Sequence, residues 1–325
     1  MMRRYKIYKI FKTSFVVVCT LSILLSNTLF GAAIRPSGLG EAGVRVIGMG
    51  EAFVGLSDDA NAVFWNPAGL AFMNKMSKHF ATTIKANDRD STTYDALAVA
   101  AAYSQEQEVD EVDSIKDILS NPEILENPTK KKVYSYVFGL GFISSEQNKT
   151  TEMRQVTFGV ADTLKSSRLS WGIKVRHVNY SNYLNEHGKY TDFTETALGI
   201  GLLYKLTDKI NIGVVADNII KDSPYDLPTL ITVGFGVKVD NSLSVDLDIF
   251  NITNEDSTMG DLQFRAGLEK RFVNDSFAIR VGTKNGNLNL GFGVRISDTF
   301  YIDYAFLADY DTDLTQHFIG GSIKF

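Results

Sequence analysis

Few residues of this chain have types and spacings suited to catalysis. The histidines are far apart along the sequence, and no serine, cysteine or carboxylate accompanies them at the spacing of a nucleophile or base. We therefore predict solvated histidines and no enzyme activity. They are His79, His177, His187 and His317.

Two short motifs resemble ligand-binding loops but are incomplete. Gly48-Met49-Gly50 lacks the third glycine and the preceding strand of a dinucleotide site. The alternating acids of residues 309–313 lack the glycine and the distal glutamate of a calcium loop. Asp58 and Asp59 could bind a cation, but helix capping explains them without one. The sequence thus predicts no cofactor and no metal.

The most specific pattern is RVIGMGEAFVGLSDDANAVFWNPAGLA at residues 45–71. Ser57 or Asp58 is expected to cap a short helix that Pro67 ends, because proline disfavours a helical residue before it. Glycines within the block allow close backbone approach. We predict a compact plug. Its motif residues are Gly48, Met49, Gly50, Asp58, Asp59, Asn66, Pro67, Ala68, Gly69 and Leu70.

Period-two alternation predicts the elements around this plug. Most of the alternating stretches are longer than the five or six residues typical of soluble strands and match the about 9–11 residues of a membrane strand. The fourteen predicted strands are 78–86, 94–104, 133–145, 151–164, 167–183, 191–206, 209–220, 229–239, 242–252, 261–272, 276–284, 287–296, 300–310 and 314–325.

The two faces of these strands differ in chemistry. In 242–252, for example, Leu247 lies on the apolar face and Asp246 and Asp248 on the polar face. Alternation alone also fits a secreted sandwich. Strand length and a polar face rich in glycine and in charges of both signs favour an all-β, closed antiparallel transmembrane barrel around a small N-terminal hatch. Lumen-facing candidates are Lys174, Arg176, Lys238, Asp246, Asp248, Arg265, Arg280, Arg295 and Asp303.

The N-terminus has the composition of a secretory signal. Residues 1–12 carry five basic side chains and no acid, residues 15–30 are largely apolar, and Gly31-Ala32-Ala33 supplies small residues for cleavage. We predict a cleaved signal peptide at 1–33, with a retained anchor helix as the alternative. The plug then occupies 34–76 and the barrel 77–325. The single cysteine, Cys19, falls in the signal, so the exported chain is no disulfide scaffold.

Composition narrows the class of protein further. The chain has 325 residues with 33 Lys plus Arg against 38 Asp plus Glu, and this net charge of -5 argues against a nucleic-acid partner. A mean hydropathy of -0.05 argues against a bundle of transmembrane helices. A barrel remains compatible, since only alternate residues contact lipid.

Connection lengths predict the ends of the barrel. Tight turns near 207–208, 240–241, 273–274 and 298–299 alternate with longer connections at 184–189, 221–228 and 251–260, as in outer-membrane barrels with short periplasmic turns. The acidic, partly helical insertion at 105–132 falls on the short-turn side. It is a solvated loop, a contact for a partner, or the result of one miscounted hairpin.

The ordered block at 45–71 resembles the FadL-like outer-membrane transporters of hydrophobic compounds, and more closely their PorV/PorQ branch. The resemblance implies a hatch inside a fourteen-stranded barrel. It implies two alternative functions: passive transport of a small hydrophobic ligand, with hatch movement and a sideways exit, or a type IX secretion accessory that binds a cargo protein. A purely structural barrel is a third possibility. The charged side chains predicted to face the lumen argue against a tunnel lined for an apolar ligand.

The last predicted strand ends in Ile323-Lys324-Phe325. The terminal Phe325 resembles the insertion signal of bacterial outer-membrane barrels, which implies the barrel-assembly machinery as a partner. With the predicted signal peptide, this favours the outer membrane as the location and its lipid as the surrounding medium.

Overall fold

The structure is a computed structural model of the 325-residue chain. It describes residues 42–73, 78–85, 93–108, 130–147, 150–164, 168–184, 188–224, 227–253, 262–309 and 314–324. The predicted signal peptide at 1–33, residues 34–41 and 74–76 of the predicted plug, residues 109–129 of the predicted insertion and Phe325 lie outside the described residues.

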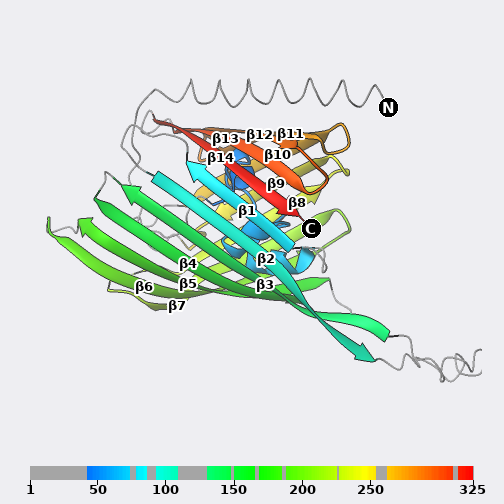
Figure 1. The fold of residues 1–325 in the computed structure, drawn as a ribbon, viewed down its shortest axis with the longest axis horizontal. Coiled ribbons are helices and arrows are strands. Elements are labelled where there is room, and N and C mark those ends of the chain that lie inside the picture. Colours follow the sequence, from blue (N-terminus) through cyan, green and yellow to red (C-terminus); the bar gives the residue numbers. More distant parts are fainter. Residues whose placement is uncertain are drawn as a thin grey trace, which may run out of the picture.

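Fourteen strands form one closed antiparallel barrel, in which β1 completes the ring against β14 (Figure 1). This confirms the predicted fold. The strands are β1 (Lys78–Lys85), β2 (Thr93–Glu108), β3 (Lys130–Gln147), β4 (Thr151–Thr163), β5 (Leu169–Leu184), β6 (Tyr190–Lys205), β7 (Ile210–Asp222), β8 (Leu230–Lys238), β9 (Leu243–Phe250), β10 (Gln263–Phe272), β11 (Phe277–Lys284), β12 (Asn287–Arg295), β13 (Phe300–Asp309) and β14 (Leu314–Lys324).

Burial within the strands is the reverse of that in a water-soluble sheet. In β9, Asp246 and Asp248 are 0% and 2% exposed, whereas Leu247 between them is 50% exposed. In β12, Gly291 is buried and Phe292 is 42% exposed. The polar and glycine positions of these strands therefore face the interior, and their large apolar side chains face outwards.

The two ends of the barrel differ in their connections. Turns 206–209, 239–242, 273–276 and 296–299 lie at one end, which we call the tight-turn end. The opposite end, here the loop end, carries the longer connections 185–189, 223–229 and 251–262. The loop-end connection between β11 and β12 is shorter than this asymmetry predicts: only Asn285 and Gly286, both at positive φ, join the two strands. Positive φ at both positions suits a two-residue hairpin.

The predicted bounds of the insertion, 105–132, wrongly include residues that belong to strands. Residues 105–108 and 130–132 are strand, and Glu108 of β2 pairs with Lys130 of β3. In Figure 1 this two-stranded ribbon extends past the tight-turn end. Strands can continue here because each satisfies backbone groups of the other. The acidic composition used to set the boundary carries no information on that pairing.

Residues 42–73, which we call the hatch, lie inside the barrel (Figure 1). They form α2 (Val44–Gly48) and two short 3-10 helices, η1 (Ala60–Val63) and η2 (Pro67–Phe72). Helix α2 contacts β11 to β14, while η2 contacts β3 to β6 on another part of the wall. The hatch thus spans the interior. Among the described residues, no helix has the length and apolar character needed to cross a membrane.

Candidate functional site

Glycines let the hatch backbone approach the wall. An added Cβ at Gly48 would lie 2.8 Å from Cα of Gly291 in β12, closer than real contacts allow. Gly50 adopts a φ of +67°, and a Cβ there would meet the backbone of Thr283 and Ala266. Only glycine combines this conformation with such close contact. These positions fix how α2 and the following turn sit against β10 to β12.

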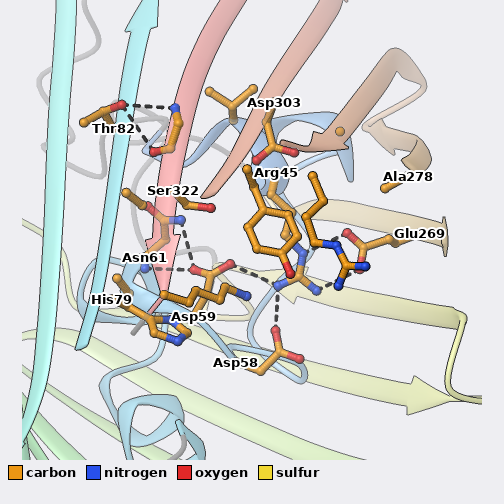
Figure 2. Close-up of a pocket in the computed structure, with 18 of the residues that line it drawn as sticks. Arg45, Asp58, Asp59, Asn61, His79, Thr82, Glu269, Ala278, Asp303 and Ser322 are labelled. Carbon is orange, nitrogen blue, oxygen red and sulfur yellow. Dashed lines mark hydrogen bonds and ion pairs between the residues drawn. The ribbon is translucent and has the colours of Figure 1, made fainter. Parts of the chain in front are cut away.

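Arg45 links one part of the hatch to another and also links the hatch to the barrel wall (Figure 2). Its Nη1 donates to Asp58 Oδ1 at 2.6 Å and to Asp59 Oδ2 at 3.0 Å, both in the hatch. Its Nε and Nη2 donate to the two carboxylate oxygens of Glu269 in β10, at 2.9 and 3.1 Å. One guanidinium therefore holds three carboxylates, two from the hatch and one from the barrel.

The ion-pair cluster extends along the wall from Glu269. Arg280 of β11 donates through Nε to Glu269 and through Nη1 to Asp303 of β13, both at 2.7 Å. On the other side, Lys238 of β8 lies 2.9 Å from the second oxygen of Asp58. The cluster thus ties the hatch to β8, β10, β11 and β13 together.

The charge state of Asp58 follows from these contacts. Burial alone would raise the pKa of its carboxyl, but the nearby charges of Arg45 and Lys238 outweigh burial and hold that pKa well below its ordinary 3.8. Asp58 is therefore ionised at neutral pH and is stabilised in that form by both cations.

Two carboxylates of β9 bind the hatch backbone. Asp248 Oδ2 accepts from the N–H groups of Phe53 and Val54 at 2.8 and 3.0 Å, and Asp246 Oδ2 accepts from Leu56 N–H at 2.9 Å. These donors lie in an irregular stretch between α2 and η1, where no helix satisfies them. The aspartates therefore supply the acceptors that this stretch lacks.

Further inward cations also meet hatch groups. Lys174 of β5 donates to the carbonyl of Phe64 at 2.6 Å and lies 2.9 Å from Asp217 of β7. Arg265 of β10 lies 3.7 Å from Glu51, to which Lys284 also donates at 2.8 Å. Inward charge in this part of the barrel is engaged in hatch contacts.

Four of the candidate lumen residues bind wall groups and make no hydrogen bond or ion pair with the hatch among the described residues: Arg176, Arg280, Arg295 and Asp303. Arg176 of β5 is buried and donates to Asn218 Oδ1 of β7 at 2.9 Å, towards the loop end. Arg295 lies at the tight-turn end, where its Nη2 donates to the carbonyl of Asn274. The nine candidates thus divide into five that bind the hatch, which are Lys174, Lys238, Asp246, Asp248 and Arg265, and these four that bind other wall residues.

The expected capping of the hatch was wrong in detail. Asp59, not Ser57 or Asp58, caps η1 by accepting from Asn61 N–H, and η1 ends at Val63. Pro67 starts η2 rather than ending a helix, because a first helical residue needs no N–H donor. Asp58 is free to pair with Arg45 because the neighbouring residue provides the cap.

The other motif residues pack the hatch core. Asn66 caps η2 through Ala68 N–H and donates to the carbonyls of Val54 and Leu202. Met49, Ala68 and Leu70 are fully buried. Met49 lies against Gly267, Leu70 against Gly139, and a Cβ at Gly69 would meet the Ser57 backbone.

A polar cavity of about 140 Å³ lies between the hatch and β1, β10 to β14, towards the tight-turn end (Figure 2). Arg45, Asp58 and Asp59 line it from the hatch, and His79 and Lys324, paired in register across β1 and β14, line it from the wall. Within the described ranges, no three His, Cys, Asp or Glu side chains are grouped to hold a metal ion.

Apolar side chains fill the other side of the hatch. Phe318 of β14 and Tyr94 of β2 meet edge to face, with ring centroids 6.5 Å apart. Both rings belong to a buried apolar cluster that also contains the hatch residues Val63 and Leu70. We call its six largest wall side chains, all towards the loop end and at most 9% exposed, the loop-end cluster: Tyr94, Ile143, Met153, Tyr180, Leu307 and Phe318.

The candidate set omitted several residues that the structure brings to the hatch. Arg45 was within the quoted block but had no assigned partner, and Glu269 and Lys284 were not selected from their strands. Glu269 lies in the same phase of β10 as Arg265, so its inward direction was readable. Its pairing with Arg45 was not, because the two are 224 residues apart.

Comparison with known proteins gives similarity in fold. No protein-family profile and no curated sequence matches the chain. The CymD monoaromatic hydrocarbon channel matches with a TM-score of 0.56 at 14% identity, covering 87% of this chain and 96% of that one. The Ralstonia pickettii toluene transporter TbuX gives 0.55 at 14%, covering 88% and 98%. A Pseudomonas aeruginosa FadL homologue gives 0.53 at 12%, covering 87% and 98%.

Proposed function

We propose that the chain is an outer-membrane barrel of the FadL-like type through which small hydrophobic compounds pass by diffusion. The observation that carries the proposal is the loop-end cluster, an apolar interior region bounded on its inner side by the hatch. A solute entering from the loop end meets Met153, Tyr180 and Phe318 before it meets the ion pairs of the hatch. Apolar lining with few polar groups suits an apolar solute.

The outward face supports the membrane location. Large apolar side chains are exposed around the barrel, among them Phe158 (48%) on β4, Leu247 on β9 and Phe264 (61%) on β10. Contiguous apolar surface of this kind is rare on soluble proteins. A closed barrel leaves no strand edge unpaired, as lipid requires.

The charged interior, which weighed against an apolar passage, is compatible with this function. Asp246 and Asp248 bind hatch N–H groups, and Arg45 and Glu269 bind one another. These charges are therefore engaged at the hatch rather than at the loop-end cluster. Passage then requires the hatch to shift, because in this structure it fills the interior between the cluster and the tight-turn end.

The shared fold gives a first choice of solute. The proteins of similar fold are described as a monoaromatic hydrocarbon channel and a toluene transporter. We therefore propose monoaromatic compounds as the probe class for this chain, on the basis of that likeness and the aromatic side chains of the cluster.

Uptake of labelled toluene by intact Gram-negative cells tests the function. Cells producing the chain should take up toluene faster than empty-vector cells, after fractionation and a heat-modifiability gel establish a folded outer-membrane barrel. Met153→Glu should abolish this gain by placing a charge in the cluster. Thr315→Glu, which puts the same group on an exposed position of β14, is the matched control and should leave uptake unchanged.

Three results would overturn the proposal. A chain that fractionates as a soluble periplasmic protein is not a membrane barrel. A folded barrel that gives no faster toluene uptake than empty-vector cells is not a channel for this solute class. Co-purification of a secreted protein's C-terminal domain, with no uptake, would favour the secretion-accessory function that the PorV/PorQ resemblance implied.

A further inference from the structure

Two buried polar side chains interrupt the apolar surface beside the loop-end cluster. Glu195 of β6 and Gln155 of β4 are each 3% exposed. Both lie opposite Val178 of β5 in the strand register, so the three residues form one row across β4, β5 and β6. Since Val178 is fully buried, the row faces the interior.

Each of these side chains has an oxygen without a hydrogen-bond partner among the described residues. Ser223 donates to Glu195 Oε1 at 3.1 Å, but Glu195 Oε2 accepts from no donor in the described part of the chain. Gln155 Nε2 donates to Thr157 Oγ1 at 3.0 Å, and its Oε1 also lacks a donor. Buried acceptors are nearly always satisfied, because a buried oxygen left unpaired loses its hydration without a compensating hydrogen bond. These two oxygens therefore call for a donor that the described chain does not supply.

An aromatic group lies directly on the loop-end side of this row. Tyr180 of β5 and Phe193 of β6 stack at 4.5 Å with an interplanar angle of 18°. Tyr183 meets Phe193 edge to face at 5.3 Å. Tyr183 and Phe193 are only partly buried, whereas Tyr180 is 2% exposed. A solute from the loop end would therefore contact Tyr183 and Phe193 first, then Tyr180 and finally the Glu195 row.

A strand irregularity accompanies this arrangement. The β5–β6 register shifts between Tyr180 and Tyr183, and Asn182 adopts a φ of 53°. Such a bulge locally redirects side chains and often lies beside a functional site. Here it brings Tyr183 against Phe193, although ideal alternation would separate Tyr180 and Tyr183 onto opposite faces.

The charged groups around Glu195 limit which class of solute can supply the missing hydrogen-bond donor. Arg176 of β5 lies diagonally across the β5–β6 pair from Glu195, so the two side chains carry groups of opposite charge type on the same inward face. A cationic solute would meet Arg176 as well, and an anionic solute would meet Glu195. A neutral donor, such as a phenolic hydroxyl, can pair with Glu195 Oε2 without disturbing that balance.

We propose that this site selects small neutral aromatic solutes that carry a hydrogen-bond donor, with the ring against Tyr180 and Phe193 and the donor bound by Glu195 Oε2. The inference rests on the proposed passage of hydrophobic compounds and defines its substrate class more narrowly. A hydrocarbon of the same shape would enter but leave the acceptor unsatisfied, and discrimination of this kind exceeds what apolar fit alone achieves.

The test compares p-cresol with p-xylene, which replaces the hydroxyl by a methyl group of similar size. In the intact-cell uptake assay, the wild-type chain should favour p-cresol over p-xylene, and Glu195→Met should lower that preference about tenfold by removing a charged acceptor. Glu152→Met, on the outward phase of the neighbouring β4 with its side chain 44% exposed, is the matched control and should keep the preference.

Each outcome decides between the two proposals. If wild type and Glu195→Met take up both compounds equally while Met153→Glu blocks both, the passage stands and the donor selectivity is wrong, since an ordered water then satisfies Glu195. If neither compound enters faster than in empty-vector cells, the passage itself fails. Should Glu195→Met not fold on the heat-modifiability gel, Glu195→Gln replaces it, because glutamine keeps the side-chain shape without the carboxylate, and an unchanged preference in that variant overturns the inference.

Discussion

Arg45 is expected to contribute strongly to holding the hatch, because three carboxylates pair with its charge. Its side chain is 14% exposed and that of Glu269 is 2% exposed, so removal of the cation leaves acids with little access to water. We expect Arg45→Met to destabilise the seated hatch by about 3–5 kcal/mol. Native-state proteolysis of the hatch by chymotrypsin measures this, since cleavage requires local opening.

A solvent-exposed pair of the same length provides the control for Arg45. Arg154 lies 2.9 Å from Glu152, but the side chains are 70% and 44% exposed. Arg154→Met should change the free energy of opening by less than about 1 kcal/mol. Equal sensitivity of the Arg45→Met and Arg154→Met variants to chymotrypsin would contradict the role of Arg45.

The low pKa of Asp58 adds a pH dependence to the stability of the seated hatch. The stabilisation from ionised Asp58 is complete above pH 3.8 and is lost as the pH falls below that value.

Single residues of the site were predictable in direction but not in partnership. The alternation of β9 gave the inward phase of Asp246 and Asp248, because period two follows from strand geometry. That both accept hydrogen bonds from residues 53–56 depends on how the hatch folds in three dimensions. Local sequence carries no such information, and the same limit hid the pairing of Arg45 with Glu269.

Elements were the most predictable level of this chain. Each strand appears in the sequence as a long stretch of alternating apolar and polar residues, and this pattern located all fourteen strands. Errors arose where alternation ends for reasons outside the strand. Residues 105–108 and 130–132 remain paired despite their charged composition. In the hatch, the proline at position 67 was taken as a stop although it is equally suited to a start.

Packing of the hatch against the wall is testable at the level of these elements. Gly50 and Gly286 both adopt positive φ, at +67° and +88°, but an added Cβ meets strand backbone only at Gly50 and nothing within 4 Å at Gly286. Alanine at either position should lose about 1 kcal/mol from the strained backbone. Gly50→Ala should lose about 1–3 kcal/mol more through overpacking, measured as increased hatch proteolysis. Equal losses in the two variants would show that the hatch does not need this close contact.

Over much of the barrel wall, large apolar side chains face outwards and charged side chains face inwards, and this inversion distinguishes a lipid-facing barrel from a soluble one. Leu247 lies midway along β9, is 50% exposed and is flanked by buried aspartates. If lipid surrounds it, Leu247→Arg should lower the free energy of unfolding by about 2–4 kcal/mol, because a charge near the bilayer midplane is costly. In water, the same surface substitution would change it by about 0.5 kcal/mol or less.

Urea unfolding from lipid vesicles measures this difference, with Val273→Arg as the control. Val273 is 79% exposed but belongs to the turn at 273–276, beyond the strands at the tight-turn end. Arginine there stays at the level of the head groups and water, where the cost falls to about 0–1 kcal/mol. A large loss for Leu247→Arg beside a small one for Val273→Arg locates the bilayer around the middle of the strands. Equal, small losses would mean that water contacts this face, and the membrane proposal would then be wrong.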